Sequence, residues 1–377
     1  MEGLARAAYT HDLKISAQGV DKRFTSKACE FMKSVLEEAV AQVIVADDQI
    51  DINVLNRFTA VYIADCSTVS LPAEWAGLWQ GVGGVGRGSE AGMKLDTRLE
   101  LKTGALHLGL LPGRHSDSRS PVAEAVHEAG SLRLQDLGYF NLARMKAQHG
   151  RGEYWLSRLQ PRTGVLTLDG EPIDVLALLK QGITRQEMMV RIGASEQLEA
   201  RLLLWKLPEQ ARAKRRAKMK ENAQKHGRAL TAESLAWCDW NFLITNVSAK
   251  KLNFDECFVL YGVRWQIELL FKLWKTHGKL GHSRSENPQR ILCEVYAKLL
   301  GVLAQHWIVL TGLWQIQERS LVKGCQMVRE QSARLAGCIN DFKALTELLK
   351  ELAERFTYGC SLNSRKTKPN TSQRFDM

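Results

Sequence analysis

One segment in the second half of the chain carries four side chains that could act on a charged substrate. Tyr261, Arg264, Glu268 and Lys275 follow one another at separations of three, four and seven residues. Each separation is near a whole number of 3.6-residue turns, so on an α-helix the four side chains share one face. A guanidinium, an ammonium and a phenol can each bind phosphate oxygens, and a carboxylate can bind a metal ion. The alternative is a solvent-exposed face with a weak Arg264–Glu268 ion pair.

Two aspartates that end predicted strands could join Glu268 in such chemistry. Residues 61–65 form a β-branched and aromatic run that ends on Asp65, and residues 132–136 form a second strand that ends on Asp136. In open α/β sheets, ligands usually bind beyond the carboxyl ends of the strands. For both residues the alternative is a turn aspartate that hydrogen-bonds the backbone nearby.

Two further acids compete with these aspartates. Asp96 is expected in the middle of a strand, and Asp117 is expected in a loop that precedes a helix. Neither of them ends a predicted strand, so both are the weaker candidates.

The elements around these residues predict a mixed α/β core. A hairpin of strands is expected at residues 93–101 and 105–111, a helix at 121–128, and another helix from Asn141 to about residue 148. Short strand-like runs joined by turns between residues 153 and 250 indicate a β-rich insertion into this core. The glycine-rich segment 81–88 matches no phosphate-binding motif and is expected to be a surface loop.

The spacing Tyr-x2-Arg-x3-Glu-x6-Lys resembles the signature of the insertion-sequence-four family of DDE transposases, and all four residues match. Residues 62–72 (YIADCSTVSLP) look like the family's segment around its first catalytic aspartate, and residues 136–140 (DLGYF) look like the segment around the second. Residues 243–246 (LITN) resemble the strand that precedes the signature helix. The resemblance covers about residues 15–310, with the motifs in the family's order.

This resemblance implies that Asp65, Asp136 and Glu268 are the catalytic residues of an RNase H-like core with a β-rich insertion. The three carboxylates are then expected to bind two Mg²⁺ ions, or Mn²⁺ in their place, with Asp65 bridging both. Two cations about 3.5–4 Å apart stabilise charge on the attacking and the leaving oxygen when a phosphodiester is displaced in line.

The resemblance also implies cut-and-paste transposition of an insertion sequence. The partners would be double-stranded DNA, as terminal inverted repeats and target, and a second copy of the chain in a homodimer on paired ends. Tyr261, Arg264 and Lys275 are expected to contact phosphates near the scissile bond. Family members cut through a hairpin intermediate with a base flipped onto a tryptophan. Trp240 is the first candidate and Trp237 the second, and packing within the insertion is the alternative for both.

Six regions are expected along the chain. They are a helical N-terminal region at residues 1–55, a first part of the core at 56–152, the β-rich insertion at 153–250, a second part of the core with the signature helix at 251–315, a helical C-terminal region at 316–360 and a basic, disordered tail at 361–377. The N-terminal region is short for the family's end-recognition region. A truncated, inactive DNA-binding remnant is therefore one alternative function, and an RNase H-like nuclease without strand transfer is another.

The charge of the chain favours a nucleic-acid partner. Its 52 Lys and Arg residues exceed its 41 acidic residues, and the formal net charge is +11. An excess of cations favours binding to a polyanion because each neutralised phosphate releases counterions. Lys214, Arg215, Arg216 and Lys218 lie in a basic segment that we expect to contact DNA, with a merely solvated helix as the alternative.

Other features are typical of a bacterial cytoplasmic protein that acts at the nucleoid. The eight cysteines are scattered and include no C-x-x-C pair, so reduced thiols are expected instead of a zinc site or a disulfide framework. The N-terminus has no apolar secretory segment. Polar residues interrupt the apolar stretch 291–314, which therefore predicts a buried or amphipathic helix and not a membrane span.

Overall fold

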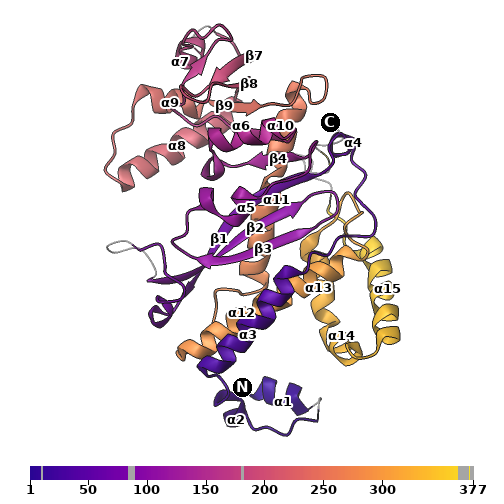
Figure 1. The fold of residues 1–377 in the computed structure, drawn as a ribbon. Helices are drawn as coiled ribbons and strands as arrows, with labels where there is room; N and C mark the ends of the chain where they lie inside the picture. Colours follow the sequence, from indigo (N-terminus) through magenta and orange to yellow (C-terminus); the bar gives the residue numbers. More distant parts are fainter. Residues whose placement is uncertain (10–11, 84–89, 180–181, 364–372, 374–377) are drawn as a thin grey trace. The chain divides into compact units, whose positions relative to one another are not determined.

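The computed structural model describes residues 1–9, 12–83, 90–179, 182–363 and 373 of the 377-residue chain (Figure 1). The chain divides into two compact units. The first consists of Met1–Asp51, Asp65–Val122 and Gln266–Ser372, and the second of Ile52–Ala64, Ala123–Trp265 and Gln373–Met377. Most of the predicted glycine-rich loop and of the predicted tail lies outside the described residues.

The described strands form one mixed sheet of nine strands in the order β3-β2-β1-β4-β5-β9-β8-β7-β6. The pairs β1–β4 and β4–β5 are parallel, and the pairs β2–β3, β5–β9, β8–β9, β7–β8 and β6–β7 are antiparallel. The strands are β1 Val61–Leu71, β2 Ala91–Glu100, β3 Leu106–Pro112, β4 Leu132–Gln135, β5 Tyr154–Arg158, β6 Val165–Leu166, β7 Arg185–Ile192, β8 Leu198–Lys206 and β9 Trp240–Thr245. The α/β class with a mixed sheet is confirmed.

The first unit combines the β2–β3 hairpin with helices from both ends of the chain. Its helical elements are α1 Glu2–Tyr9, α2 Ala17–Asp21, α3 Ser26–Ala41, η1 Ala73–Trp75, η2 Asp117–Arg119, η4 Leu273–His277, α12 Pro288–Leu310, α13 Leu321–Glu330, α14 Ser332–Cys338 and α15 Phe342–Gly359. The hairpin is the predicted one, with Leu99 opposite Leu106. Its turn requires Gly104, which has φ +74° and lies so close to Leu310 that a Cβ would be 2.4 Å from that side chain.

Helix α12 carries the apolar stretch that was predicted to be a buried or amphipathic helix. By length and composition alone this helix could cross a membrane. It packs along α3 (Figure 1), where the sulfur atoms of Cys29 and Cys293 are 3.5 Å apart, and its His306 ring lies 2.8 Å from the carbonyl oxygen of Gly104. These contacts make α12 a core helix of the first unit. None of the eight cysteines, all of which lie within the described ranges, forms a disulfide.

The second unit is built on strands β4 to β9 and the first residues of β1. Its helical elements are α4 Asn53–Asn56, η3 Leu137–Tyr139, α6 Leu142–Gly150, α7 Val175–Leu179, α8 Glu209–Lys225, α9 Ala232–Cys238 and α10 Phe254–Val263. Strands β6 to β9 enclose an apolar core that includes Trp155, Ile192, Leu202, Trp240 and Phe242. The predicted insertion, residues 153–250, therefore contains the predicted strands. Its described residues also form helices α7, α8 and α9, of which the basic helix α8 is the longest.

Two sequence-based boundaries were wrong. Strand β1 does not end at Asp65 but continues to Leu71. From Thr68 onward its side chains alternate: Thr68 and Ser70 are exposed, and Val69 and Leu71 are buried, which is the pattern of a half-buried strand. Helix α5, Pro121–Glu124, is shorter than the helix predicted at 121–128.

Candidate active site and nucleic-acid interface

Asp65 lies in the first unit, within strand β1. The parallel pairing of β1 with β4 extends to Ile63, which is opposite Leu134. Asp65 and Asp136 each follow this last pair by two residues, so Asp65 marks the end of the parallel pairing although it does not end the strand. The backbone N–H of Cys66 donates a hydrogen bond of 2.8 Å to Asp65 Oδ1, which orients a carboxylate that is still partly exposed.

The competing acid Asp96 has a structural role in the first unit. It is fully buried in β2, and its two oxygens accept hydrogen bonds from the Cys66 thiol at 3.3 Å and from the Val122 backbone N–H at 3.0 Å. Asp117 forms an ion pair with Lys94. The expectation that these two acids are the weaker candidates therefore stands, but on burial and partners instead of on strand ends.

Asp136 lies in the second unit, directly after β4 and at the start of the short helix η3. Its side chain is 33% exposed, and its Oδ2 lies 3.9 Å from Nη1 of Arg264. This distance permits an ion pair but is too long for a hydrogen bond. Asp136 and Arg264 are thus brought together without being locked to each other.

The Tyr261 phenol lies beside this pair. Its hydroxyl oxygen is buried, and this burial raises the pKa of Tyr261 to about 12. The positive charges of Arg158 and Arg264 oppose the increase, whereas the charge of Asp136 adds to it. The phenol therefore stays protonated at neutral pH and can donate a hydrogen bond to an anion.

Sequence reasoning missed Arg158, which is the last residue of β5. Its Nε is buried and has no hydrogen-bond partner within the described ranges. Its positive charge acts on Tyr261 and also lowers the pKa of Arg215, for which burial is the larger cause. Burying a cation without a paired donor costs free energy, and an anionic ligand would offset that cost. The signal available in the sequence was an arginine within the strand-like run at residues 154–159.

The spacing predicted that the four signature residues, Tyr261, Arg264, Glu268 and Lys275, lie on one uninterrupted α-helix. This prediction was wrong. Helix α10 ends at Val263, Arg264 caps it, and α11 spans Trp265–Lys272. The turn that follows, η4, is a π-helix and contains Lys275. A π-turn takes more residues than an α-turn, so the seven residues from Glu268 to Lys275 no longer correspond to two turns. Both side chains belong to the first unit, where Glu268 is partly exposed and Lys275 is exposed.

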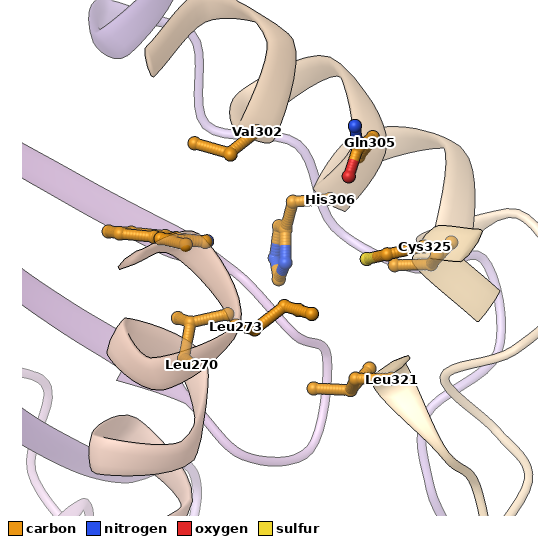
Figure 2. A pocket seen from close by; sticks show the side chains of 9 residues that line it. Leu270, Leu273, Val302, Gln305, His306, Leu321 and Cys325 are labelled. Carbon is orange, nitrogen blue, oxygen red and sulfur yellow. The ribbon is translucent and has the colours of Figure 1, made fainter. Parts of the chain in front are cut away.

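The π-turn rests on apolar neighbours of the first unit. Leu270, Leu273 and Trp274 line a small pocket that His306 enters from helix α12 (Figure 2). The amide N–H of Gly278 donates a hydrogen bond of 3.1 Å to the carbonyl oxygen of Leu273, which closes the wide turn. Neighbouring protein atoms remove part of the water around the Lys275 ammonium, and this lowers the pKa of Lys275. One side of the π-turn is therefore packed against the first unit, and Lys275 lies on the other, exposed side.

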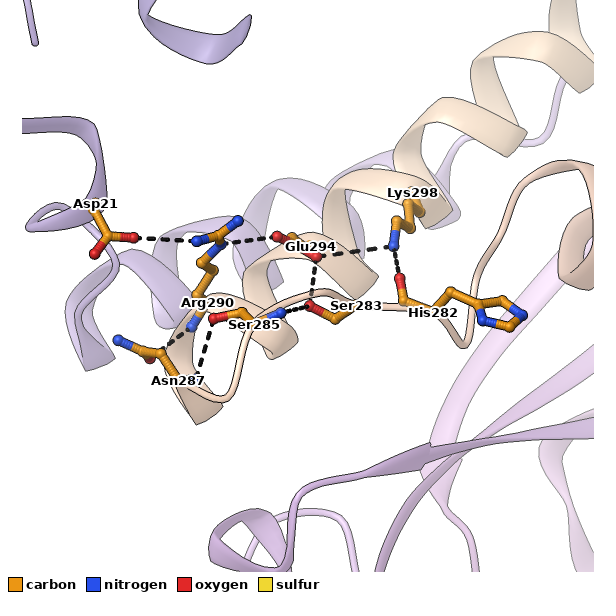
Figure 3. A network of polar contacts seen from close by, with 8 residues as sticks. All are labelled: Asp21, His282, Ser283, Ser285, Asn287, Arg290, Glu294 and Lys298. Atoms are coloured by element: carbon orange, nitrogen blue, oxygen red, sulfur yellow. Dashed lines mark hydrogen bonds and ion pairs between the residues drawn. The ribbon is translucent and has the colours of Figure 1, made fainter. Parts of the chain in front are cut away.

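The segment after the π-turn is tied to α12 by a polar network (Figure 3). Glu294 accepts hydrogen bonds from the Ser283 hydroxyl at 2.8 Å and from Arg290 Nε at 3.0 Å. Lys298 contacts the His282 carbonyl oxygen, and Arg290 also reaches Asp21 of α2 at 3.3 Å. These contacts fix the residues that follow Lys275 on the surface of the first unit.

Trp240 is not available as a base-stacking residue. Its side chain is 4% exposed and belongs to the apolar core of the insertion, which is the packing role that had been the alternative. Trp237 also packs within the insertion, with its ring 4.0 Å from that of Phe242. Trp265, next to Arg264, is 55% exposed and was not considered from the sequence. Its ring is the more accessible one for stacking.

Two of the four basic residues expected to contact DNA on α8 are engaged within the insertion. Arg216 Nε donates a hydrogen bond of 2.7 Å to Asp239, and Arg215 Nη2 donates one of 2.8 Å to Asn241. Lys214 and Lys218 point to solvent. The basic helix therefore does not present all of its charge outward.

The donor set suits a hard divalent cation. Asp65, Asp136 and Glu268 all offer carboxylate oxygens, which are the ligands that Mg²⁺ and Mn²⁺ prefer, and all three are partly exposed. Asp65 and Glu268 belong to the first unit and Asp136 to the second. Within the part of the chain that the structure describes, no group of three His, Cys, Asp or Glu side chains gathers at one point. The three residues therefore fit a divalent cation by the chemistry of their oxygen atoms and by their exposure to solvent.

Known proteins resemble this chain over most of its length. Residues 58–303 match the family described as Transposase DDE domain. The chain is 27% identical over 365 residues to the transposase for insertion sequence element IS231F of Bacillus thuringiensis subsp. israelensis. The aligned region covers 90% of this chain and 76% of that protein. It is also 27% identical over 334 residues to the transposase for insertion sequence element IS1151 of Clostridium perfringens, which covers 82% of this chain and 70% of that protein.

Proposed function

The chain belongs to the Transposase DDE domain family, and from this premise we propose that it moves an insertion sequence by cut-and-paste transposition. It is an enzyme that cleaves DNA and joins it to a new site. The observation that carries the proposal is the position of Asp65, Asp136 and Glu268, three partly exposed carboxylates within the residues that match the family. We assign the mixed sheet to an RNase H-like core, with residues 153–250 as its insertion.

Asp65, Asp136 and Glu268 are the proposed ligands of two Mg²⁺ ions, for which Mn²⁺ can substitute. DDE domains generally use divalent metal ions, and carboxylates supply the oxygen ligands that such ions need. When bound, the ions stabilise negative charge on the attacking and leaving oxygens of the phosphodiester. The hydrogen bond from the Cys66 backbone fixes the orientation of the Asp65 carboxylate before any ligand arrives.

Tyr261, Arg264, Lys275 and Arg158 are the proposed phosphate ligands. The Arg264 guanidinium lies 3.9 Å from the Asp136 carboxylate, and its planar fork has the geometry to bind two phosphate oxygens. The protonated Tyr261 hydroxyl can donate one hydrogen bond, and Arg158 has a buried Nε that a phosphate oxygen could satisfy. These groups would position the strand at the carboxylates.

The proposed substrates are the terminal inverted repeats of the element and a target duplex, both in the cytoplasm. Two ends must be held together for excision and joining, so we propose a homodimer on paired ends. The chemistry needs no covalent protein intermediate, because a 3′-hydroxyl released by cleavage can attack the target phosphodiester directly.

The test compares wild type with Glu268→Gln on a supercoiled plasmid that carries the DNA flanking the gene, with Mg²⁺ or with EDTA. Cleavage at the repeat boundary should require Mg²⁺ and should fall by roughly 100-fold or more in the variant, because losing about 3 kcal/mol of charge stabilisation slows a reaction by that factor. Glu354→Gln, an exposed glutamate on α15, is the matched control and should cleave like wild type.

Other outcomes identify the rival functions. Cleaved ends without joined products would support a nuclease that lacks strand transfer. Binding of the ends with no cleavage under Mg²⁺ or Mn²⁺ would support an inactive remnant. Equal loss of cleavage in Glu268→Gln and Glu354→Gln would refute the assignment of Glu268.

A further inference from the structure

Helix α8 combines a high charge with the absence of a buried side. It spans Glu209–Lys225, none of its residues is buried, and it runs beside α9 within the insertion (Figure 1). Seven of its residues are basic, namely Arg212, Lys214, Arg215, Arg216, Lys218, Lys220 and Lys225. The helix is held in place by a contact of Met219 with Cys238 and by polar contacts, and the polar contacts divide its cations into two sets.

The arginines face the insertion. Asp239, which is 7% exposed, accepts hydrogen bonds from Nε and Nη2 of Arg216, and its Oδ2 lies 3.8 Å from Nη1 of Arg212. Arg215 donates to the side chain of Asn241 at 2.8 Å. The forked guanidiniums thus anchor α8 to the segment between α9 and β9, with Asp239 as the central acceptor.

Three lysines face the opposite way. Lys214, Lys218 and Lys225 are separated by four and seven residues, so they lie within about 40° of one another around the helix. All three are exposed, and within the described ranges their ammonium groups have neither an ion pair nor a hydrogen bond. We call Lys214, Lys218 and Lys225 the lysine face. Glu221 lies on the same side of the helix, and one acid against three lysines leaves this side with a net positive charge.

The geometry of the lysine face fits a linear polyanion. From Lys214 to Lys225 the helix rises about 16 Å at 1.5 Å per residue. This length equals about five base pairs of duplex DNA at 3.4 Å per step. Like charges four residues apart on a helix repel each other slightly, and attraction of each ammonium to a nearby phosphate would offset that repulsion.

We propose that the lysine face of α8 binds the phosphate backbone of double-stranded DNA, while the arginines and Asp239 hold the helix in position for this contact. The inference rests on the proposed function, because it assumes that the enzyme acts on duplex DNA. The contact is independent of sequence, since ammonium groups that meet phosphates read no base edges.

The test measures affinity for a duplex as a function of salt concentration. The full chain with Lys214→Gln, Lys218→Gln and Lys225→Gln is compared with wild type on a duplex that carries one element end. Loss of three phosphate contacts should lower the slope of log affinity against log salt by about 2.7. The advantage of wild type should then shrink by about 40-fold between 50 and 200 mM salt.

Two further variants make the result specific. A control with Lys22→Gln, Lys343→Gln and Lys350→Gln removes the same charge from exposed positions of the first unit and should keep the wild-type slope. A second variant, with Lys214→Arg, Lys218→Arg and Lys225→Arg, keeps the three positive charges and should show the wild-type slope and affinity. Circular dichroism checks that the helix content of each variant is unchanged.

An unchanged slope in the α8 glutamine variant, or equal reductions in that variant and in the control, would overturn the inference. A site for an acidic protein on this face would give the first of these results. Failure of the proposed function is separate, because it would appear as absence of Mg²⁺-dependent cleavage by wild type whatever the salt dependence of binding.

Discussion

Replacement of His306 by glutamine should remove a large part of the loss of stability that acid causes. The ring is fully buried in α12, and its Nε2 lies 2.8 Å from the carbonyl oxygen of Gly104, to which a neutral ring can donate. Burial lowers the pKa of His306 to about 4; the hydrogen bond to Gly104 opposes this and the charge of Arg319 adds to it. Glutamine keeps a donor for this carbonyl and cannot be protonated in the same range.

The magnitude follows from the two protonation equilibria. The unfolded ring binds a proton below about pH 6.5, whereas the folded ring does so only below about pH 4. Between these values the unfolded state binds more protons, so stability falls as the pH falls. The full effect is about 3 kcal/mol, and at pH 5 about 2 kcal/mol of it is already lost.

Urea unfolding at pH 7.5 and pH 5.0, followed by tryptophan fluorescence, measures this effect. The ring of Trp314 lies 5.7 Å from that of His306 and reports on the same region. Between the two pH values wild type should lose about 2 kcal/mol more than His306→Gln. The same pH dependence in both proteins would refute the reasoning, because it would mean that the buried ring does not control protonation on unfolding.

Two more substitutions probe the second unit. Asp239→Asn should weaken the attachment of α8 through Arg216 and Arg212 and speed amide hydrogen exchange in residues 209–225 about tenfold. Unchanged exchange would contradict the anchoring role. Arg158→Gln should lower affinity for a duplex end about tenfold, because a charge-assisted hydrogen bond of about 1.5 kcal/mol is lost. Fluorescence anisotropy of a labelled duplex measures this affinity. If the variant binds DNA like wild type but has an altered unfolding midpoint, Arg158 instead supports Tyr261 structurally.

The sequence alone determined the local features of this protein. The hairpin of β2 and β3 follows from alternating side chains and a turn at Gly104. The family was also evident, because the spacing of Tyr261, Arg264, Glu268 and Lys275 is a property of the chain and not of its folding. Patterns of this kind involve residues close in sequence, where backbone geometry fixes the relation between side chains.

Tertiary structure decided where the strand and helix patterns end. Nothing in the residues after Asp65 forbids a turn, and β1 continues to Leu71 because Val69 and Leu71 are buried by neighbours from elsewhere in the chain. Likewise the π-turn at Lys275 depends on packing of Leu273 and Trp274 against α12 and α13, which local spacing does not encode.

The availability of single side chains was also decided by long-range contacts. Trp240 and Trp265 are the same residue type near the same motifs, yet the first is enclosed by strands β6 to β9 and the second is exposed. Arg216 differs from Lys218 because Asp239, 23 residues further along, accepts its hydrogen bonds. Burial and pairing depend on which distant segments fold against a residue, so only the folded chain separates a structural side chain from one that is free to bind DNA.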